Sequence, residues 1–109
     1  MSGNRVILDS NIIIYLSQKK LSLDEVFDQD VEYAISIITY MEILSFNFTS
    51  LDEEKFIKEL LGFFEIIDID YTIANRVIEL KKRRKIKLPD AIIVASALLN
   101  NSILYTNDQ

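Results

Sequence analysis

Apolar and polar positions along this chain fall into blocks, with short apolar runs separated by longer amphipathic stretches. The first run, residues 5–8, is continuously apolar after its arginine, which is typical of a central strand in a parallel sheet. Similar runs at residues 33–38, 65–69 and 102–105 predict three further strands. The pattern therefore predicts four short strands spread over the length of the chain.

The stretches between these strands predict helices. The tripeptide at 9–11 offers N-cap chemistry for a helix over residues 11–16. Thr39 and Glu42 fit a capping box, in which each side chain accepts a hydrogen bond from the backbone amide of the other residue. A helix is therefore expected to follow the second strand there. Apolar residues at helical spacing cover residues 52–64 and 70–85, and a last helix opens at Leu88-Pro89-Asp90.

Strands separated by helices throughout imply parallel pairing through right-handed crossovers, with helices on both faces of a twisted sheet. The predicted fold class is α/β. At 109 residues, with two glycines and one proline and no internal repeat, the chain is expected to form a single domain over residues 1–109.

The chain contains neither cysteine nor histidine. Their absence excludes disulfides, thiolate catalysis, cysteine zinc sites and a Ser-His-Asp mechanism, so any hydrolysis must use carboxylates and cations that prefer oxygen ligands. The net charge of −5 gives no general attraction to nucleic acid, and a phosphate ligand would need local cations. Because no apolar stretch approaches the roughly 20 residues of a transmembrane helix, we expect a soluble, cytoplasmic protein.

Acidic residues stand where predicted strands end or predicted helices begin. Asp9 follows the first strand and Asp108 follows the last. Glu42 and Asp90 lie in the first turns of predicted helices. In open α/β sheets the ligand crevice lies beyond the carboxyl ends of the strands, where the strand order reverses, so these acids could converge there. Each acid also has a purely local explanation as a helix cap or a partner of the helix dipole.

Carboxylates gathered in one crevice repel one another. Two unit charges about 4 to 5 Å apart cost roughly 3 to 4 kcal/mol at an effective dielectric constant of about 20. Several such pairs would strain a domain whose stability is typically about 5 to 15 kcal/mol. Either some of the acids are protonated or a divalent cation neutralises them, and oxygen ligands without histidine or cysteine favour Mg²⁺ or Mn²⁺ over zinc.

Four short motifs carry the acids, in a fixed order that covers nearly the whole chain. They are Asp9-Ser10-Asn11, the segment 38–44 around Glu42, the segment 88–95 around Asp90, and Thr106-Asn107-Asp108. Any one of them is a weak signal, but the ordered set resembles PIN-domain ribonucleases, and within them the small VapC-type toxins.

The resemblance implies a three-layer α/β/α fold with a short twisted parallel sheet. It also implies a homodimer, a cognate antitoxin, and hydrolysis of RNA phosphodiester bonds supported by Mg²⁺ or Mn²⁺ held by the catalytic acids Asp9, Glu42, Asp90 and Asp108. The chain departs from the family pattern at its end, because it stops at Gln109 whereas relatives usually continue through another acidic-aromatic step and a terminal strand. A C-terminal truncation, and with it the fourth ligand, is therefore left open.

Polar neighbours of the acids are candidates for orienting carboxylates or waters. They are Ser10, Asn11 and Thr106. Ordinary turn and cap chemistry explains the same residues at least as well.

One run concentrates positive charge against an acidic background: Lys81, Lys82, Arg83, Arg84, Lys85 and Lys87. It could grip RNA phosphates beside the metal site. Alternatively, cations at the end of the helix over residues 70–85 favour its dipole and stay solvated.

We therefore predict a metal-dependent endoribonuclease that acts as the toxin of a type II toxin–antitoxin pair. The alternative is a catalytically degenerate or truncated PIN-like module that acts only by binding a partner. A phosphoacceptor receiver domain is disfavoured, because Asp9 is a single acid after its strand and no lysine follows Lys87.

Overall fold

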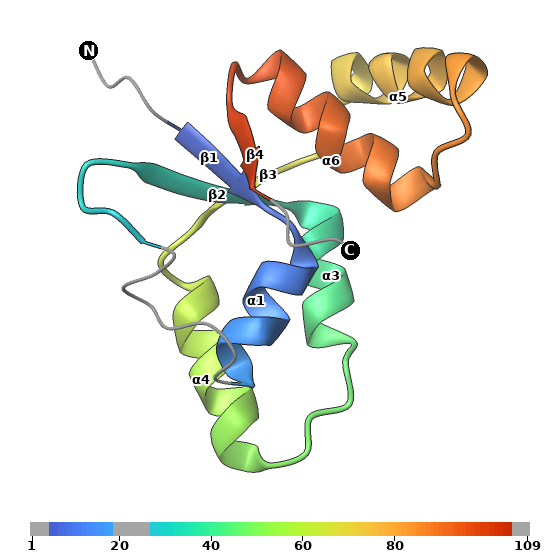
Figure 1. The fold of residues 1–109 in the computed structure, drawn as a ribbon. Helices are drawn as coiled ribbons and strands as arrows, with labels where there is room; N and C mark the ends of the chain where they lie inside the picture. Colours follow the sequence, from blue (N-terminus) through green and yellow to red (C-terminus); the bar gives the residue numbers. More distant parts are fainter. Residues whose placement is uncertain (1–4, 19–26, 106–109) are drawn as a thin grey trace.

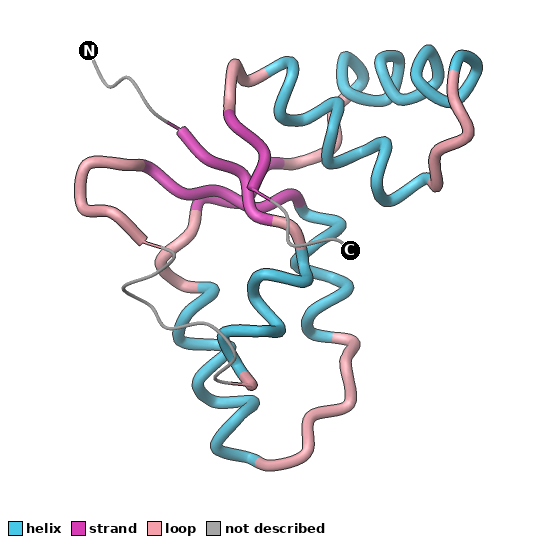
Figure 2. Tube along the Cα trace, in the orientation of Figure 1, coloured by secondary structure: helices cyan, strands magenta, loops and turns pink. Residues whose placement is uncertain are grey.

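A parallel sheet forms the centre of the fold (Figure 2). The computed structural model describes residues 5–18 and 27–105, and in this part of the chain four strands pair in the order β3-β2-β1-β4, all parallel. The strands are β1 (Arg5–Leu8), β2 (Glu32–Ser36), β3 (Glu65–Ile67) and β4 (Ile103–Tyr105). Each predicted strand is present, and the last three are shorter than the apolar runs that predicted them.

Helices cover both faces of this sheet (Figure 1). They are α1 (Ser10–Ser17), α3 (Ile37–Leu44), α4 (Leu51–Leu61), α5 (Tyr71–Arg83) and α6 (Leu88–Leu99). One face carries α1, α3 and α4, and the other carries α5 and α6. The predicted three-layer α/β/α arrangement is thus confirmed. Within residues 5–18 and 27–105, none of the helices combines the length and apolar character needed to span a membrane.

The two faces of the strands build two hydrophobic cores. Leu8 and Ile35 are fully buried in a core with α1, α3 and α4. Their neighbours Ile7 and Ala34 are fully buried in a second core with α5 and α6. Because side chains alternate along a strand, a strand covered on both faces must be apolar at successive positions, which explains the unbroken run in β1. Burial of each large aliphatic side chain contributes about 1.5 to 3 kcal/mol.

The start of α3 differs from the sequence prediction. The helix begins at Ile37 and its N-cap is Ser36, whose hydroxyl oxygen accepts a hydrogen bond from the Ile38 amide at 3.2 Å. Thr39 is fully buried, and its hydroxyl has no hydrogen-bond partner among the described residues. The predicted capping box is therefore wrong, because Ser36 caps the first turn, and Ile37 and Ile38, which have the composition of a strand, begin the helix. Glu42 consequently lies in the second turn of its helix rather than the first.

The turn between α6 and β4 returns the chain to the centre of the sheet. Asn101 adopts the left-handed backbone conformation, with φ of 51°, which asparagine tolerates better than most residues. The Ser102 amide then donates to the Ala97 carbonyl at 2.9 Å and closes the end of the helix. β4 thereby pairs with β1 on the side opposite β2, so the strand order reverses between β1 and β4. A ligand crevice is expected at the carboxyl ends of these two strands.

Candidate active site

A pocket of about 610 Å³ lies beyond the carboxyl end of β1, at the reversal of strand order. We call it the acidic pocket. It is formed by the β1–α1 junction, the second turn of α3, the loop before α6, the first two turns of α6, and β4. Its lining residues are Asp9, Ser10, Asn11, Glu42, Lys85, Ile86, Lys87, Asp90, Ile93, Val94 and Leu104.

Asp9 is placed by the abrupt change from strand to helix. It is the N-cap of α1, and one carboxylate oxygen accepts a hydrogen bond from the Ile12 amide at 3.1 Å. The local explanation of this residue is therefore correct, and the residue also lines the pocket. Because a carboxylate has two oxygens and about four acceptor positions, capping the helix does not use up its capacity to bind a cation.

The pKa of Glu42 depends on its burial and on neighbouring side chains. Partial burial of its carboxyl group raises its pKa above the ordinary value of 4.5, and the negative charges of Asp90 and Asp9 raise it further. A hydrogen bond from Ser10 acts in the opposite direction and lowers the pKa. The three acids, which are 33 and 48 positions apart along the chain, therefore interact across one pocket.

Asp90 lies in the first turn of α6, directly after Pro89. Proline is harmless there because the first helical amides have no partner within the helix. The N-terminal end of a helix carries partial positive charge, which favours an aspartate at this position. Ile93 and Val94 lie one turn further along the same face of the helix and also line the acidic pocket.

The donor set suits a hard divalent cation. The oxygen ligands available in the pocket are three carboxylates, a serine hydroxyl and a side-chain amide, which are the donors that Mg²⁺ and Mn²⁺ prefer. As the side chains stand, no group of three or more acidic residues in the described part of the chain is arranged to hold a metal ion. Glu42 and Asp90 are exposed, so their side chains are free of the packing that would prevent rotation toward a shared ion.

The structure therefore brings together Asp9, Glu42 and Asp90, with Ser10 and Asn11 beside them. Asp108 and Thr106, the other predicted members of the site, lie outside the described residues. Sequence analysis missed the apolar part of the lining. Ile93 and Val94 follow Asp90 by three and four residues, so helical spacing could have indicated them. The positions of Ile86 and Leu104 depend on tertiary packing. The missed residues are Ile86, Ile93, Val94 and Leu104.

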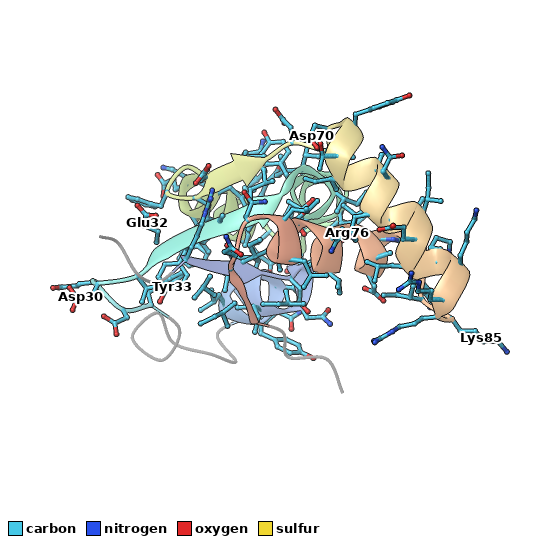
Figure 3. All side chains as sticks on the ribbon, turned by 90° about the horizontal axis from the view of Figure 1, so that it is seen from above. Asp30, Glu32, Tyr33, Asp70, Arg76 and Lys85 are labelled. Atoms are coloured by element: carbon cyan, nitrogen blue, oxygen red, sulfur yellow. The ribbon has the colours of Figure 1, made fainter. Side chains whose placement is uncertain are left out.

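Only two residues of the basic run line the acidic pocket. Lys85 and Lys87 line the acidic pocket, on the loop that follows α5. Figure 3 shows Lys85 beyond the far end of α5, with Asp70 at the beginning of that helix. The Lys81 ammonium donates a hydrogen bond to the Ile86 carbonyl at 2.8 Å. The remaining members of the run are exposed and do not line the pocket, namely Lys82, Arg83 and Arg84.

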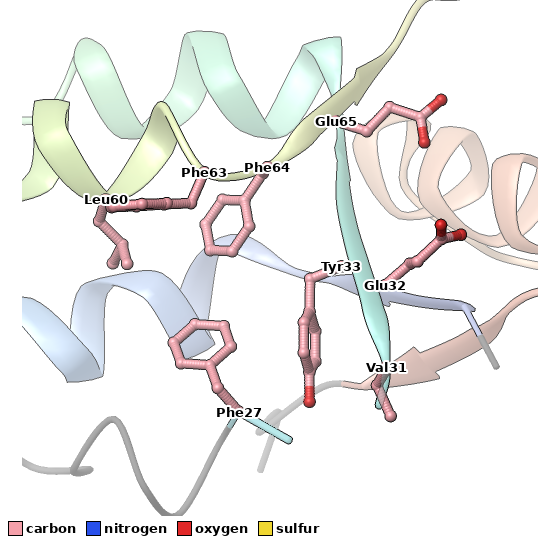
Figure 4. A pocket seen from close by; sticks show the side chains of 8 residues that line it. All are labelled: Phe27, Val31, Glu32, Tyr33, Leu60, Phe63, Phe64 and Glu65. Atoms are coloured by element: carbon pink, nitrogen blue, oxygen red, sulfur yellow. The ribbon is translucent and has the colours of Figure 1, made fainter. Parts of the chain in front are cut away.

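A second pocket, of about 480 Å³, is aromatic rather than acidic (Figure 4). Phe27, Tyr33 and Phe64 are in ring contact within it, with centroid separations of 4.9 and 5.7 Å. Two glutamates line one edge, and one of them, Glu65, forms an ion pair with Arg5. This pocket offers packing surface but lacks the convergent set of oxygen ligands found in the acidic pocket.

Comparison with known proteins gives a family and a fold. The model of the PIN domain family matches residues 6–109. A solved structure described as a toxin–antitoxin complex from Klebsiella pneumoniae is similar at 35% sequence identity, with a TM-score of 0.75 and coverage of 94% of this chain and 86% of that chain. No curated protein sequence matches the chain.

Two further solved structures share the fold. DNA-bound VapBC from Salmonella typhimurium is similar at 23% identity, with a TM-score of 0.82 and coverage of 96% of this chain and 87% of that chain. VapBC-1 from nontypeable Haemophilus influenzae is similar at 26% identity, with a TM-score of 0.72 and coverage of 95% and 87%.

Proposed function

Because the chain belongs to the PIN domain family, we propose that it is a metal-dependent endoribonuclease that hydrolyses RNA phosphodiester bonds. The resemblance to VapC-type PIN domains that the ordered acids predicted is confirmed at the level of family and fold. The nuclease activity, the RNA substrate and the metal belong to the proposal.

The observation that carries this proposal is the convergence of Asp9, Glu42 and Asp90 in one pocket. Like charges within interacting distance destabilise a fold unless something positive is bound between them. Burial is the main cause of the raised pKa of Glu42, and the negative charges of Asp90 and Asp9 raise that pKa further, which supports their repulsion. Glu42 is neither the cap of α3 nor in its first turn, so helix capping does not explain its position in this pocket.

The acidic pocket supplies the ligands for Mg²⁺ or Mn²⁺. Asp9, Glu42 and Asp90 would hold the cation, with Asp108 as the proposed fourth ligand. The bound ion would supply positive charge for the phosphate and lower the pKa of an attacking water. A hydrogen bond from Ser10 lowers the pKa of Glu42, and Ser10, Asn11 and Thr106 are proposed to orient carboxylates or waters. Because the chain has no histidine, proton transfer falls to carboxylates and water.

The partners follow from the same proposal. The similar structure from Klebsiella pneumoniae is a toxin–antitoxin complex, which supports an antitoxin as a partner of this chain and a toxin role in a type II pair. We include a homodimer in the proposal, as the resemblance implies. A cytoplasmic location is part of the same proposal.

A second candidate function is a PIN-like module that binds a partner without catalysis. It is favoured by one observation, namely that no three acidic side chains among the described residues are arranged to hold an ion as they stand. The two functions differ in a single property. Only the nuclease needs the acids to close around a cation in the presence of RNA.

Cleavage of labelled single-stranded RNA in Mn²⁺ tests the proposed function. Asp90→Asn keeps the size of the side chain and removes its charge, so we expect it to reduce cleavage to background. Asp30→Asn is the matched control, because Asp30 is exposed and lies at the opposite end of the molecule from Lys85 (Figure 3). Wild-type protein that leaves all RNAs intact in Mn²⁺ would favour the partner-binding module instead.

A further inference from the structure

The loop between α5 and α6 forms one wall of the acidic pocket. We propose that Lys85 and Lys87 on this wall contact the backbone phosphates of a single-stranded RNA crossing the pocket, and that Lys81 is a positioning residue that fixes the wall. The inference rests on the proposed function and goes beyond it, because it separates the basic run into RNA-contacting, positioning and uninvolved residues.

Hydrogen bonds fix this loop at both ends and at its middle. The Arg84 amide donates to the Leu80 carbonyl at 3.0 Å and ends α5, while the Ala91 amide donates to the Lys87 carbonyl at 2.9 Å and begins α6. Between them, the Lys81 ammonium donates to the Ile86 carbonyl at 2.8 Å. Ile86 is half-buried and packs against the second hydrophobic core. These contacts hold the loop against the end of α5, the start of α6 and the second core.

Lys81 does not act as an ordinary cation at a helix end. Such a lysine would favour the last carbonyls of its own helix, whereas the Lys81 ammonium bonds a carbonyl three residues beyond Arg83, where α5 ends. The contact links the helix to the pocket wall. It is an exposed charge-assisted hydrogen bond, so its loss should loosen the loop without unfolding the domain.

Lys85 and Lys87 line a pocket that contains three acids, yet neither lysine forms an ion pair within the described residues. In the described part of the chain the ion pairs join Arg5 to Glu65, Lys58 to Glu54, and Arg76 to Glu79. None involves the two lysines of the wall. The lining of the acidic pocket therefore combines three carboxylates with two lysines that form no ion pair among the described residues. This arrangement suits a cation and a phosphodiester bound side by side, with each lysine acting as a point charge toward a phosphate.

The salt dependence of RNA binding tests the role of the wall. Binding of a fluorescein-labelled single-stranded RNA is measured in the Asp90→Asn background, so that bound RNA stays intact. Each phosphate contact by a lysine on single-stranded nucleic acid contributes about 0.7 to the slope of log affinity against log salt. We expect Lys85→Met and Lys87→Met each to reduce the magnitude of that negative slope by about 0.7. The control Lys55→Met, an exposed lysine on α4, should leave the slope unchanged. Equal slopes in all variants would overturn the role of the wall.

Steady-state RNA cleavage tests Lys81. We expect Lys81→Met to raise KM about 3- to 10-fold with kcat nearly unchanged, and Lys81→Arg, which retains a donor, to restore KM. A Tm close to that of Lys55→Met would show that the fold is intact. A KM for Lys81→Met equal to that of Lys55→Met, or no rescue by arginine, would overturn the positioning role.

Failure of the inference and failure of the proposed function are distinguishable. If wild-type protein leaves RNA intact in Mn²⁺, the proposed function fails, and the binding slopes still decide the role of the wall. If wild-type protein cleaves RNA while the lysine variants match Lys55→Met, the inference alone fails.

Discussion

Ser10 and Glu42 are joined by a side-chain hydrogen bond between the first residue of α1 and the second turn of α3. This contact brings the serine hydroxyl to the carboxylate of Glu42, which shares a pocket with Asp9, the acid that follows β1. It stabilises the ionised form of Glu42 against the desolvation and the two negative charges that act in the opposite direction.

Removing the serine hydroxyl should raise the pKa of Glu42 further. We expect Ser10→Ala to move the titration of the Glu42 carboxyl carbon, followed by ¹³C NMR in metal-free buffer, to higher pH. Ser45→Ala provides the control, since Ser45 is exposed at the opposite end of α3. An unchanged titration in Ser10→Ala would show that the hydrogen bond does not govern this carboxylate.

Neutralising Glu42 should stabilise the metal-free protein at neutral pH. An acid whose pKa is raised in the folded state binds its proton more tightly when folded, so stability falls as pH rises from about 4.5 through the folded pKa. Glu42→Gln removes this penalty and can still accept a hydrogen bond from Ser10. Because Glu42 is exposed, the gain should be small, about 1 to 3 °C in Tm at pH 7, and should vanish well below pH 4.5. Thermal unfolding in EDTA across this pH range measures it, and lower stability of Glu42→Gln at pH 7 would contradict the repulsion.

The two roles of Asp9 can be separated by two substitutions. Asparagine is as good an N-cap as aspartate, so Asp9→Asn should leave the Tm in EDTA within about 2 °C of wild type. Asp9→Ala removes the cap to Ile12, which typically costs about 1 kcal/mol and lowers Tm by about 4 to 8 °C in a domain of this size. If both variants are equally destabilised in thermal unfolding, the cap is not the structural role of Asp9.

The start of α3 gives a test of which residue caps the helix. Ser36→Ala should lower the free energy of unfolding by about 1 kcal/mol or more, since its buried hydroxyl accepts from the Ile38 amide. Thr39→Val removes a buried hydroxyl that has no partner among the described residues, so it should be neutral or slightly stabilising. Urea unfolding of both variants measures the difference. A larger loss in Thr39→Val would restore the capping box that the sequence suggested.

Most of the fold follows from local patterns in the sequence. The strands of a doubly covered sheet must be apolar at successive positions, and the caps at Asp9 and Asp70 mark where α1 and α5 begin. The boundary of α3 was misjudged because Ile37 and Ile38 have the composition of a strand. Both residues are half-buried, and Ile38 packs against the second hydrophobic core, so tertiary packing rather than local propensity decides their conformation.

The acids at the ends of strands and helices could be predicted, but the contacts between them could not. Asp9 and Asp90 occupy junctions that the sequence marks directly, whereas the bond from Ser10 to Glu42 depends on how α1 packs against α3. The division of the basic run depends on α5 ending at Arg83, which leaves Lys85 on the loop beside the pocket. Spacing along a chain does not specify such tertiary details.

The central claim is that Asp9, Glu42 and Asp90 share one divalent cation, and calorimetric titration with Mn²⁺ tests it most directly. We predict that wild-type protein binds Mn²⁺ and that Asp9→Asn, Glu42→Gln and Asp90→Asn each weaken binding at least about tenfold. Asp30→Asn should bind as tightly as wild type. Wild-type protein that binds no Mn²⁺, or three variants that bind it as tightly as wild type, would contradict the account.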